Sequence, residues 1–90
     1  MEKAEELIGS LLTSKRREKI LKLLKNKSLR PTQIAEIIEL PQSNVSVVLF
    51  QLEKEGLVVC LTPNKKSWRV YKIINLGQET LKNFENENSL

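Results

Sequence analysis

Residues 31–58 constrain the fold of this chain more than any other segment; their sequence is PTQIAEIIELPQSNVSVVLFQLEKEGLV. Pro31 suits the first turn of a helix, where a missing N–H has no intrahelical partner to lose. A second helix follows the turn at Leu40-Pro41, and Gly56 can supply a left-handed stop at its end. The segment therefore predicts two short helices joined by a tight turn and followed by a strand, the order of a helix-turn-helix.

Apolar residues recur in these two helices at the spacing of a buried helix face. In the first helix, over residues 31–38, we expect the inward-facing residues to be Ile34, Ala35, Ile37 and Ile38. In the second helix, over residues 43–55, the core stripe should comprise Val45, Val48, Leu49 and Leu52. Phe50 falls outside that stripe, which leaves open whether it packs under the first helix or lies on a partner surface.

The flanking segments complete a single domain over residues 1–90 that is α+β but mostly α. A short helix is expected at 3–12, within an N-terminal segment 1–13, and a stronger one at 14–26 with Ser14 as its cap. Residues 57–61 and 68–74 are rich in β-branched and aromatic residues and predict a two-stranded hairpin, with Tyr71 and Ile73 on its inner face. A C-terminal helix over 76–86 follows this core of residues 14–74.

The composition argues against an enzyme and against a metal protein. The chain has no histidine and one cysteine, so it lacks histidine for acid–base catalysis, an internal disulfide and nearly every transition-metal site. It also has no Gly-rich phosphate loop, and we expect no cofactor and no small-molecule substrate.

No apolar run approaches the roughly 18 residues of a membrane span, and the N-terminus lacks the basic start of a secretory signal. We therefore expect a cytoplasmic protein with Cys60 as a buried apolar residue.

Positive charge is distributed unevenly along the chain, whose net charge is +4. Residues 15–30 hold eight basic residues and one acidic residue, and residues 61–75 hold four basic residues and no acidic one. The predicted helix-turn-helix between them is acidic. Basic blocks on both sides of it suit contact with nucleic-acid phosphates, although a solvated lysine-rich surface would have the same composition.

Four pieces of the chain, in order, resemble the small winged helix-turn-helix transcriptional regulators of the MarR and ArsR types found in bacteria and archaea. They are KILKLL at 19–24, PTQIA at 31–35, SNVSVVLFQLEKEGLV at 43–58 and RVYKIINLGQETL at 69–81. The run LEKEGLV is the most specific of them, and the resemblance covers about residues 14–84. It implies a winged helix-turn-helix: helices with a two-stranded β-hairpin wing and a C-terminal helix.

The resemblance also implies how such a chain would act. In these regulators the third helix lies in the major groove of double-stranded DNA, and the wing reaches the flanking backbone. The residues that would contact DNA from the third helix are Gln42, Ser43, Asn44, Ser46, Val47 and Gln51. Thr32 and Gln33 would meet phosphate at a helix N-terminus, and Lys65, Lys66 and Arg69 would make the wing contacts. The expected protein is a transcriptional repressor that dimerises through its terminal segments, 1–13 and 76–90.

Other interpretations of the same residues remain open. Ser43, Asn44 and Ser46 also suit a helix N-terminus because they satisfy free N–H groups. Lys65 and Lys66 also suit a soluble β-edge. The acidic helix-turn-helix, with Val47 and Phe50, would fit a winged-helix protein-interaction module in a larger assembly. Metal sensing of the ArsR type needs clustered cysteines or histidines, which this chain does not have.

Overall fold

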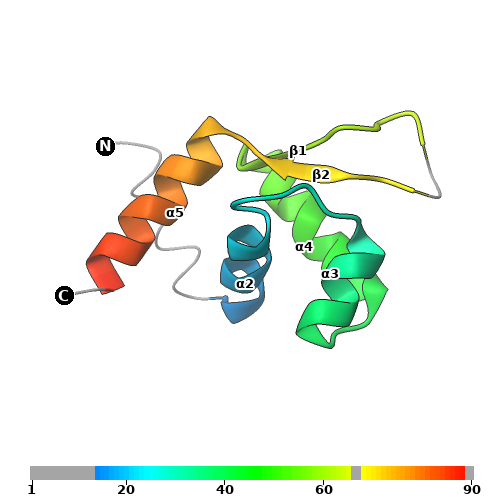
Figure 1. Ribbon diagram of the computed structural model, residues 1–90, viewed down its shortest axis with the longest axis horizontal. Helices are drawn as coiled ribbons and strands as arrows, with labels where there is room; N and C mark the ends of the chain where they lie inside the picture. The colour runs from blue at the N-terminus through cyan, green and yellow to red at the C-terminus, as the bar shows by residue number, and fades with distance from the viewer. Residues whose placement is uncertain (1–13, 66–67, 89–90) are drawn as a thin grey trace.

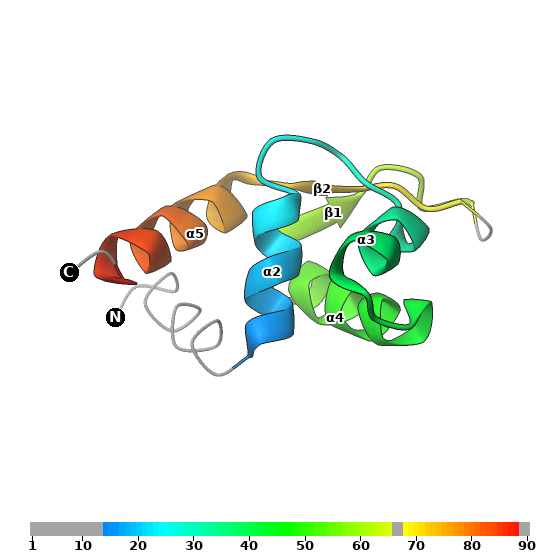
Figure 2. The same ribbon diagram turned by 60° about the horizontal axis from the view of Figure 1, so that its bottom comes forward.

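A two-stranded hairpin and four helices make up the parts of the chain that the computed structural model describes, residues 14–65 and 68–88. In chain order they are α2 (Lys15–Leu23), α3 (Pro31–Ile38), α4 (Gln42–Lys54), β1 (Val58–Cys60), β2 (Tyr71–Ile73) and α5 (Asn75–Asn88). The hairpin projects beyond α3 at one end of the molecule, and α5 lies at the other (Figure 1). Figure 2 shows α2 between α5 and the α3–α4 pair. The predicted winged helix-turn-helix is confirmed, and the helix expected at 3–12 lies outside the described residues.

Helix α2 begins at its predicted cap and ends earlier than predicted. The hydroxyl of Ser14 accepts a hydrogen bond from the backbone N–H of Arg17 at 3.3 Å. The helix ends at Leu23 rather than at residue 26, and the N–H of Leu24 closes it by donating to the carbonyl of Ile20 at 3.2 Å. The chain leaves the helix here because Leu29, five residues further on, is paired with the hairpin.

The turn between α3 and α4 depends on a left-handed glutamate. Glu39 has φ 57° and ψ 47°, and the next N–H, of Leu40, donates to the carbonyl of Ala35 at 3.2 Å. Ile34 is fully buried, but Ile37 is 51% exposed, so the prediction that Ile37 faces inward was wrong. An eight-residue helix presents only a narrow face to the core, and Ile34 with the half-buried Ala35 and Ile38 fills it.

Helix α4 supplies the centre of the core, and all four of its predicted core residues are buried. It begins and ends one residue earlier than predicted, at Gln42 and Lys54, and the predicted left-handed conformation of Gly56 is confirmed at φ 78°. The hairpin covers this core with one face: Cys60 pairs with Tyr71, Val58 pairs with Ile73, and these side chains are buried. The expected burial of Cys60, Tyr71 and Ile73 is confirmed.

The sheet has a further partner that the sequence did not indicate. Leu29, just before α3, exchanges two backbone hydrogen bonds with Tyr71, of 3.1 Å and 2.8 Å. Strand β2 is therefore bonded on both edges, to β1 and to Leu29. The regular ladder is shorter than the predicted 57–61 and 68–74, because the hydroxyl of Thr62 takes over pairing at the base of the wing. It accepts from the N–H of Val70 at 3.1 Å and donates to the carbonyl of Trp68 at 3.2 Å.

Helix α5 packs closely against Leu57, just before the start of β1. It begins at Asn75 and runs to Asn88, one residue earlier and two later than predicted. A side chain at Gly77 would place its Cβ 2.2 Å from the carbonyl oxygen of Leu57, so only glycine permits this approach. Leu81 and Phe84 from the same helix are buried in the core.

The left-handed Glu39 gives a test of the helix-turn-helix geometry. Left-handed backbone costs a non-glycine residue about 1–2 kcal/mol, and the greater unfolded-state freedom of glycine offsets about 0.4–1 kcal/mol of that. Glu39→Gly should therefore raise the free energy of unfolding by about 0.5–1 kcal/mol. Glu36→Gly, the same substitution inside α3, should lower it by about 1 kcal/mol. Urea unfolding measures both, and a destabilised Glu39→Gly would contradict the turn geometry.

Candidate nucleic-acid interface

The exposed side of α4 carries most of the predicted contact residues. A helix has 3.6 residues per turn, and burying Val45, Val48, Leu49 and Leu52 turns the opposite side outward. Of the residues predicted to face DNA, Asn44 is half-buried and the exposed ones are Gln42, Ser43, Ser46, Val47 and Gln51. The predicted positions therefore lie on one continuous surface of the helix.

The centre of that surface is apolar. Ser43, Val47, Phe50 and Lys54 succeed one another at helical spacing and point furthest from the core; we call them the α4 crest. Val47 is 56% exposed and Phe50 63% exposed. Phe50 was absent from the predicted contact residues. Its position three residues after Val47 and outside the core stripe is the sequence signal that could have identified it.

A groove runs beside the α4 crest, between the start of α3, the flank of α4 and the base of the wing. It has a volume of about 540 Å³; we call it the wing groove. Of the predicted contact residues it brings together Thr32, Gln42, Ser46 and Arg69. Arg30, which was not predicted, adds a second guanidinium at the start of α3. Phe50, Glu53, Trp68 and Tyr71 also line the groove, so one carboxylate lies among the two arginines. Two guanidiniums against one carboxylate leave the groove with a net positive charge, which suits an anionic ligand.

Gln33 and Gln51, by contrast, have internal partners. The side-chain oxygen of Gln33 accepts from the backbone N–H of Arg30 at 2.8 Å, so it caps α3. The side-chain oxygen of Gln51 accepts from the guanidinium of Arg17 at 3.2 Å. Each amide retains its NH₂ group for other contacts, but the oxygen that adenine recognition uses is engaged within the chain.

Arg17 links α2 to the C-terminal half of α4. Besides donating to Gln51, it forms an ion pair with Glu55, the residue that follows α4. The two side chains are only 13% and 29% exposed. Burial lowers the pKa of Arg17, but a guanidinium begins from so high a value that it stays charged at neutral pH. Its charge is therefore used to hold α4 in place.

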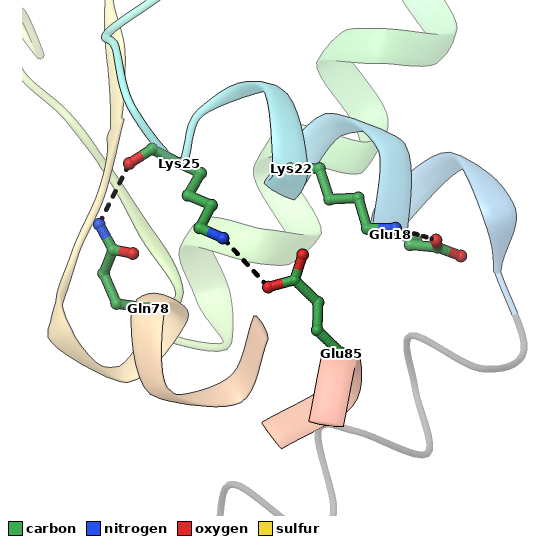
Figure 3. Close-up of polar contacts among 5 residues, drawn as sticks. All are labelled: Glu18, Lys22, Lys25, Gln78 and Glu85. Carbon is green, nitrogen blue, oxygen red and sulfur yellow. Dashed lines mark hydrogen bonds and ion pairs between the residues drawn. The ribbon is translucent and has the colours of Figure 1, made fainter. Parts of the chain in front are cut away.

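Two further lysines of the basic block, Lys22 and Lys25, have partners within the chain. Lys22 pairs with Glu18 at 2.8 Å, one turn apart, and lies 5.8 Å from the ring centre of Phe84. Lys25 pairs with Glu85 of α5 at 3.1 Å, and its carbonyl accepts from the side chain of Gln78 at 3.3 Å (Figure 3). The basic block at 15–30 thus serves partly to attach α2 to α5, and the wing groove receives only Arg30 from it.

The wing carries the other predicted cations. Lys65 is exposed, with its ammonium 5.4 Å from the ring centre of Trp68, and Lys66 lies outside the described residues. Arg69 turns back toward β1, and a hydrogen bond with Cys60 raises its pKa. For Cys60 itself, burial raises the pKa of the thiol, but hydrogen bonds from Arg69 and Thr62 outweigh this effect and leave it below the usual value. Arg69 is thereby held at the edge of the wing groove.

Comparison with protein families agrees with this arrangement. Residues 14–59 match the family model described as "Bacterial regulatory protein, arsR family". The chain belongs to the arsR family. This family consists of regulators rather than enzymes, and the matched region runs from α2 to β1. A sequence comparison with curated proteins gives no match.

Solved structures share the winged helix-turn-helix fold. Reduced HlyU from Vibrio cholerae superposes with a TM-score of 0.76 at 25% identity, over 97% of this chain and 86% of HlyU. A ZitR mutant from Lactococcus lactis gives 0.73 at 18% identity, over 84% of this chain and 53% of ZitR. The homodimeric winged helix-turn-helix DNA-binding domain of Mb0332 from Mycobacterium bovis gives 0.70 at 23% identity, over 96% and 76%. The chain therefore spans about half the length of ZitR.

Two further properties concern only the described residues. No group of three or more histidine, cysteine, aspartate or glutamate side chains in residues 14–65 and 68–88 is placed to hold a metal ion. None of the described helices combines the length and apolar character of a membrane span.

The link between α2 and α4 can be tested by substitution. Arg17→Met should lower the free energy of unfolding by about 1–2 kcal/mol, between the values for exposed and buried ion pairs, because it leaves Glu55 half-buried without its cation. Arg16→Met removes an exposed neighbouring charge and should change stability by less than about 0.5 kcal/mol. Arg17→Met combined with Glu55→Gln should recover part of the loss. Equal effects of the two arginine substitutions in thermal unfolding would refute the link.

Proposed function

We propose that the protein is a homodimeric, sequence-preferring double-stranded DNA-binding regulator that represses transcription by blocking promoter access. Helix α4 enters the major groove, which is wide enough to admit an α-helix, and the wing lies on the flanking backbone. The observation that supports this best is the wing groove, where Arg30, Arg69 and Thr32 lie beside the exposed surface of α4. An anionic backbone in that groove would bring α4 against the base edges.

The contacts then divide into two kinds. Thr32, at the start of α3, and Lys65, Lys66 and Arg69, on the wing, contact phosphates, which position the protein without recognising sequence. Gln42, Ser43, Asn44, Ser46 and Val47 face the bases. Gln33 and Gln51 contribute through their NH₂ groups, since their oxygens are bonded to Arg30 and Arg17.

Titration of a fluorescent random-sequence duplex at about 50 and 200 mM salt tests this function directly. Binding should fall steeply with salt, because each phosphate contact releases condensed counterions and adds about 0.9 to the slope of log K against log salt. Lys65→Ala should reduce that slope by about one, and Lys65→Ala with Lys66→Ala by about two.

Lys19→Ala is the matched control for the wing substitutions. Lys19 is exposed on α2, outside the wing, the wing groove and the terminal segments that we assign to the dimer interface. Its loss removes the same charge and should leave the slope unchanged. A slope that falls equally for Lys19→Ala and Lys65→Ala would refute wing contact.

Dimerisation requires a surface beyond the described core. Mb0332 has a homodimeric DNA-binding domain of this fold, and the terminal segments 1–13 and 76–90 are the regions that we assign to the interface. Leu81 and Phe84 of α5 are already buried within the chain. The contribution of α5 must therefore come from its outer residues, such as Gln78, Glu79 and Lys82.

Sedimentation equilibrium tests the dimer without altering the chain. At micromolar concentration the protein should sediment with twice its mass of 10.4 kDa, and selected binding sites should contain half-sites about 10 base pairs apart. A monomer bound to a single half-site would refute the dimer while leaving DNA binding intact.

The apolar α4 crest supports one alternative, a winged-helix module that docks on another protein. Phe50 and Val47 are large exposed apolar side chains next to each other on one face. Under this alternative the titration would show no binding to duplex DNA at low salt, whereas the regulator requires it.

A further inference from the structure

The centre of the α4 crest presents carbon rather than hydrogen-bonding groups. Val47 and Phe50 occupy its middle and are more than half exposed, with Ser43 and Lys54 at its ends. Helix α4 contains no arginine, and Lys54 is its only cation. Arginine or lysine bonded to guanine is the commonest specific contact in the major groove, and the middle of the crest cannot make it.

The flank of the helix next to α2 does not replace that contact. The amide oxygen of Gln51 accepts from Arg17, which is itself held by Glu55. To form the paired hydrogen bonds by which a glutamine recognises adenine, Gln51 would have to share this oxygen with Arg17 or release it. On the other flank, the hydrogen-bonding groups of Gln42 and Ser46 lie beside the crest rather than at its centre, and they line the wing groove together with Phe50, Glu53, Arg30 and Arg69.

We propose that Val47 and Phe50 contact the C5-methyl groups of thymine in the major groove. The protein then binds DNA whose pyrimidines carry a C5-methyl group more tightly than DNA whose pyrimidines lack it. This inference rests on the proposed function. The thymine methyl is the apolar feature of the major groove floor, and apolar side chains are its natural contacts. Cations on the neighbouring groove direct the crest toward a polyanion, which makes DNA rather than an apolar protein surface its occupant. The sites would be rich in A·T pairs, and 5-methylcytosine would substitute for thymine where cytosine would not.

The test compares duplexes that differ only in this methyl group. Two fluorescent 30-base-pair DNA duplexes are used, one of alternating deoxyadenosine and thymidine and one of alternating deoxyadenosine and deoxyuridine. They have the same base pairing and the same charge. Each methyl group buried against an apolar side chain should tighten binding about fourfold, the equivalent of about 0.8 kcal/mol. A second pair of duplexes, of inosine with cytosine and of inosine with 5-methylcytosine, should show the same preference for the methylated member.

Two variants assign the effect to the crest. Val47→Ala with Phe50→Ala should bind the thymine and uracil duplexes equally, at about the affinity of the unaltered protein for the uracil duplex. Val59→Ala is the matched control, since Val59 is an exposed valine on the outward face of β1. Val59→Ala removes two methyl groups, as Val47→Ala does, and should keep the preference for thymine. The altered side chains are all exposed, so circular dichroism should show unchanged folding.

The outcomes separate this inference from the proposed function. Equal binding of both duplexes by the unaltered protein would overturn methyl recognition and leave DNA binding standing. A thymine preference that persists in the Val47→Ala, Phe50→Ala variant would also overturn it, because other residues would then carry the discrimination. Failure to bind any duplex would overturn the proposed function, and the crest would then be a surface for a protein partner.

Discussion

The pair of hydrogen bonds between Leu29 and Tyr71 determines how the parts of this molecule are placed. Leu29 lies immediately before α3, and Tyr71 begins β2, which leads back from the wing. Their two bonds, of 3.1 Å and 2.8 Å, therefore fix the start of α3 beside the base of the hairpin. Arg30 and Thr32 follow Leu29 directly, and Arg69 precedes Tyr71 by two residues, so the same pairing brings all three into the wing groove.

The sequence predicted the features that arise from local patterns. The core stripe of α4, the cap at Ser14 and the left-handed Gly56 each depend on residues within a few positions of one another, and each was confirmed.

The pairing of Leu29 with Tyr71 and the hydrogen bond between Gln51 and Arg17 were not predicted. Leu29 contributes a single-residue bridge to a strand 42 positions later in the chain, and Gln51 meets Arg17 across 34 positions. A one-residue strand has no alternation to detect, and the resemblance placed Gln51 on a surface without showing its partner. Ile37 was misplaced because its spacing fits the apolar stripe, whereas the short α3 has room in the core for fewer residues.

Several basic residues have acidic partners that the composition of the chain does not reveal. Residues 15–30 form the most basic part of the sequence, yet Arg17, Lys22 and Lys25 pair with Glu55, Glu18 and Glu85. The pairs of Lys22 and Lys25 lie at the surface, where each contributes little to stability, whereas the pair of Arg17 is more buried. Together with the bond from Gln78 they join α2 to α4 on one side and to α5 on the other (Figure 3). Lys15, Arg16, Lys19 and Lys27 of the same block are exposed and lie outside these pairs, and the two cations that the fold gathers at the wing groove, Arg30 and Arg69, come from two separate segments.

Affinity for DNA and discrimination between sequences would arise from different residues, the cations of the groove and wing on one hand and the apolar crest on the other. Phosphate contacts from the wing groove and the wing depend on charge, so they are strong at low salt and nearly the same for every sequence. The α4 crest is apolar at its centre, so its contribution would change little with salt and would depend on which bases lie beneath it. An exposed phenylalanine and valine on one helix face add nothing to the core of the described chain, because the buried stripe of α4 is complete without them. Raising the salt should therefore weaken binding to thymine and uracil duplexes in parallel, while the ratio between them stays the same.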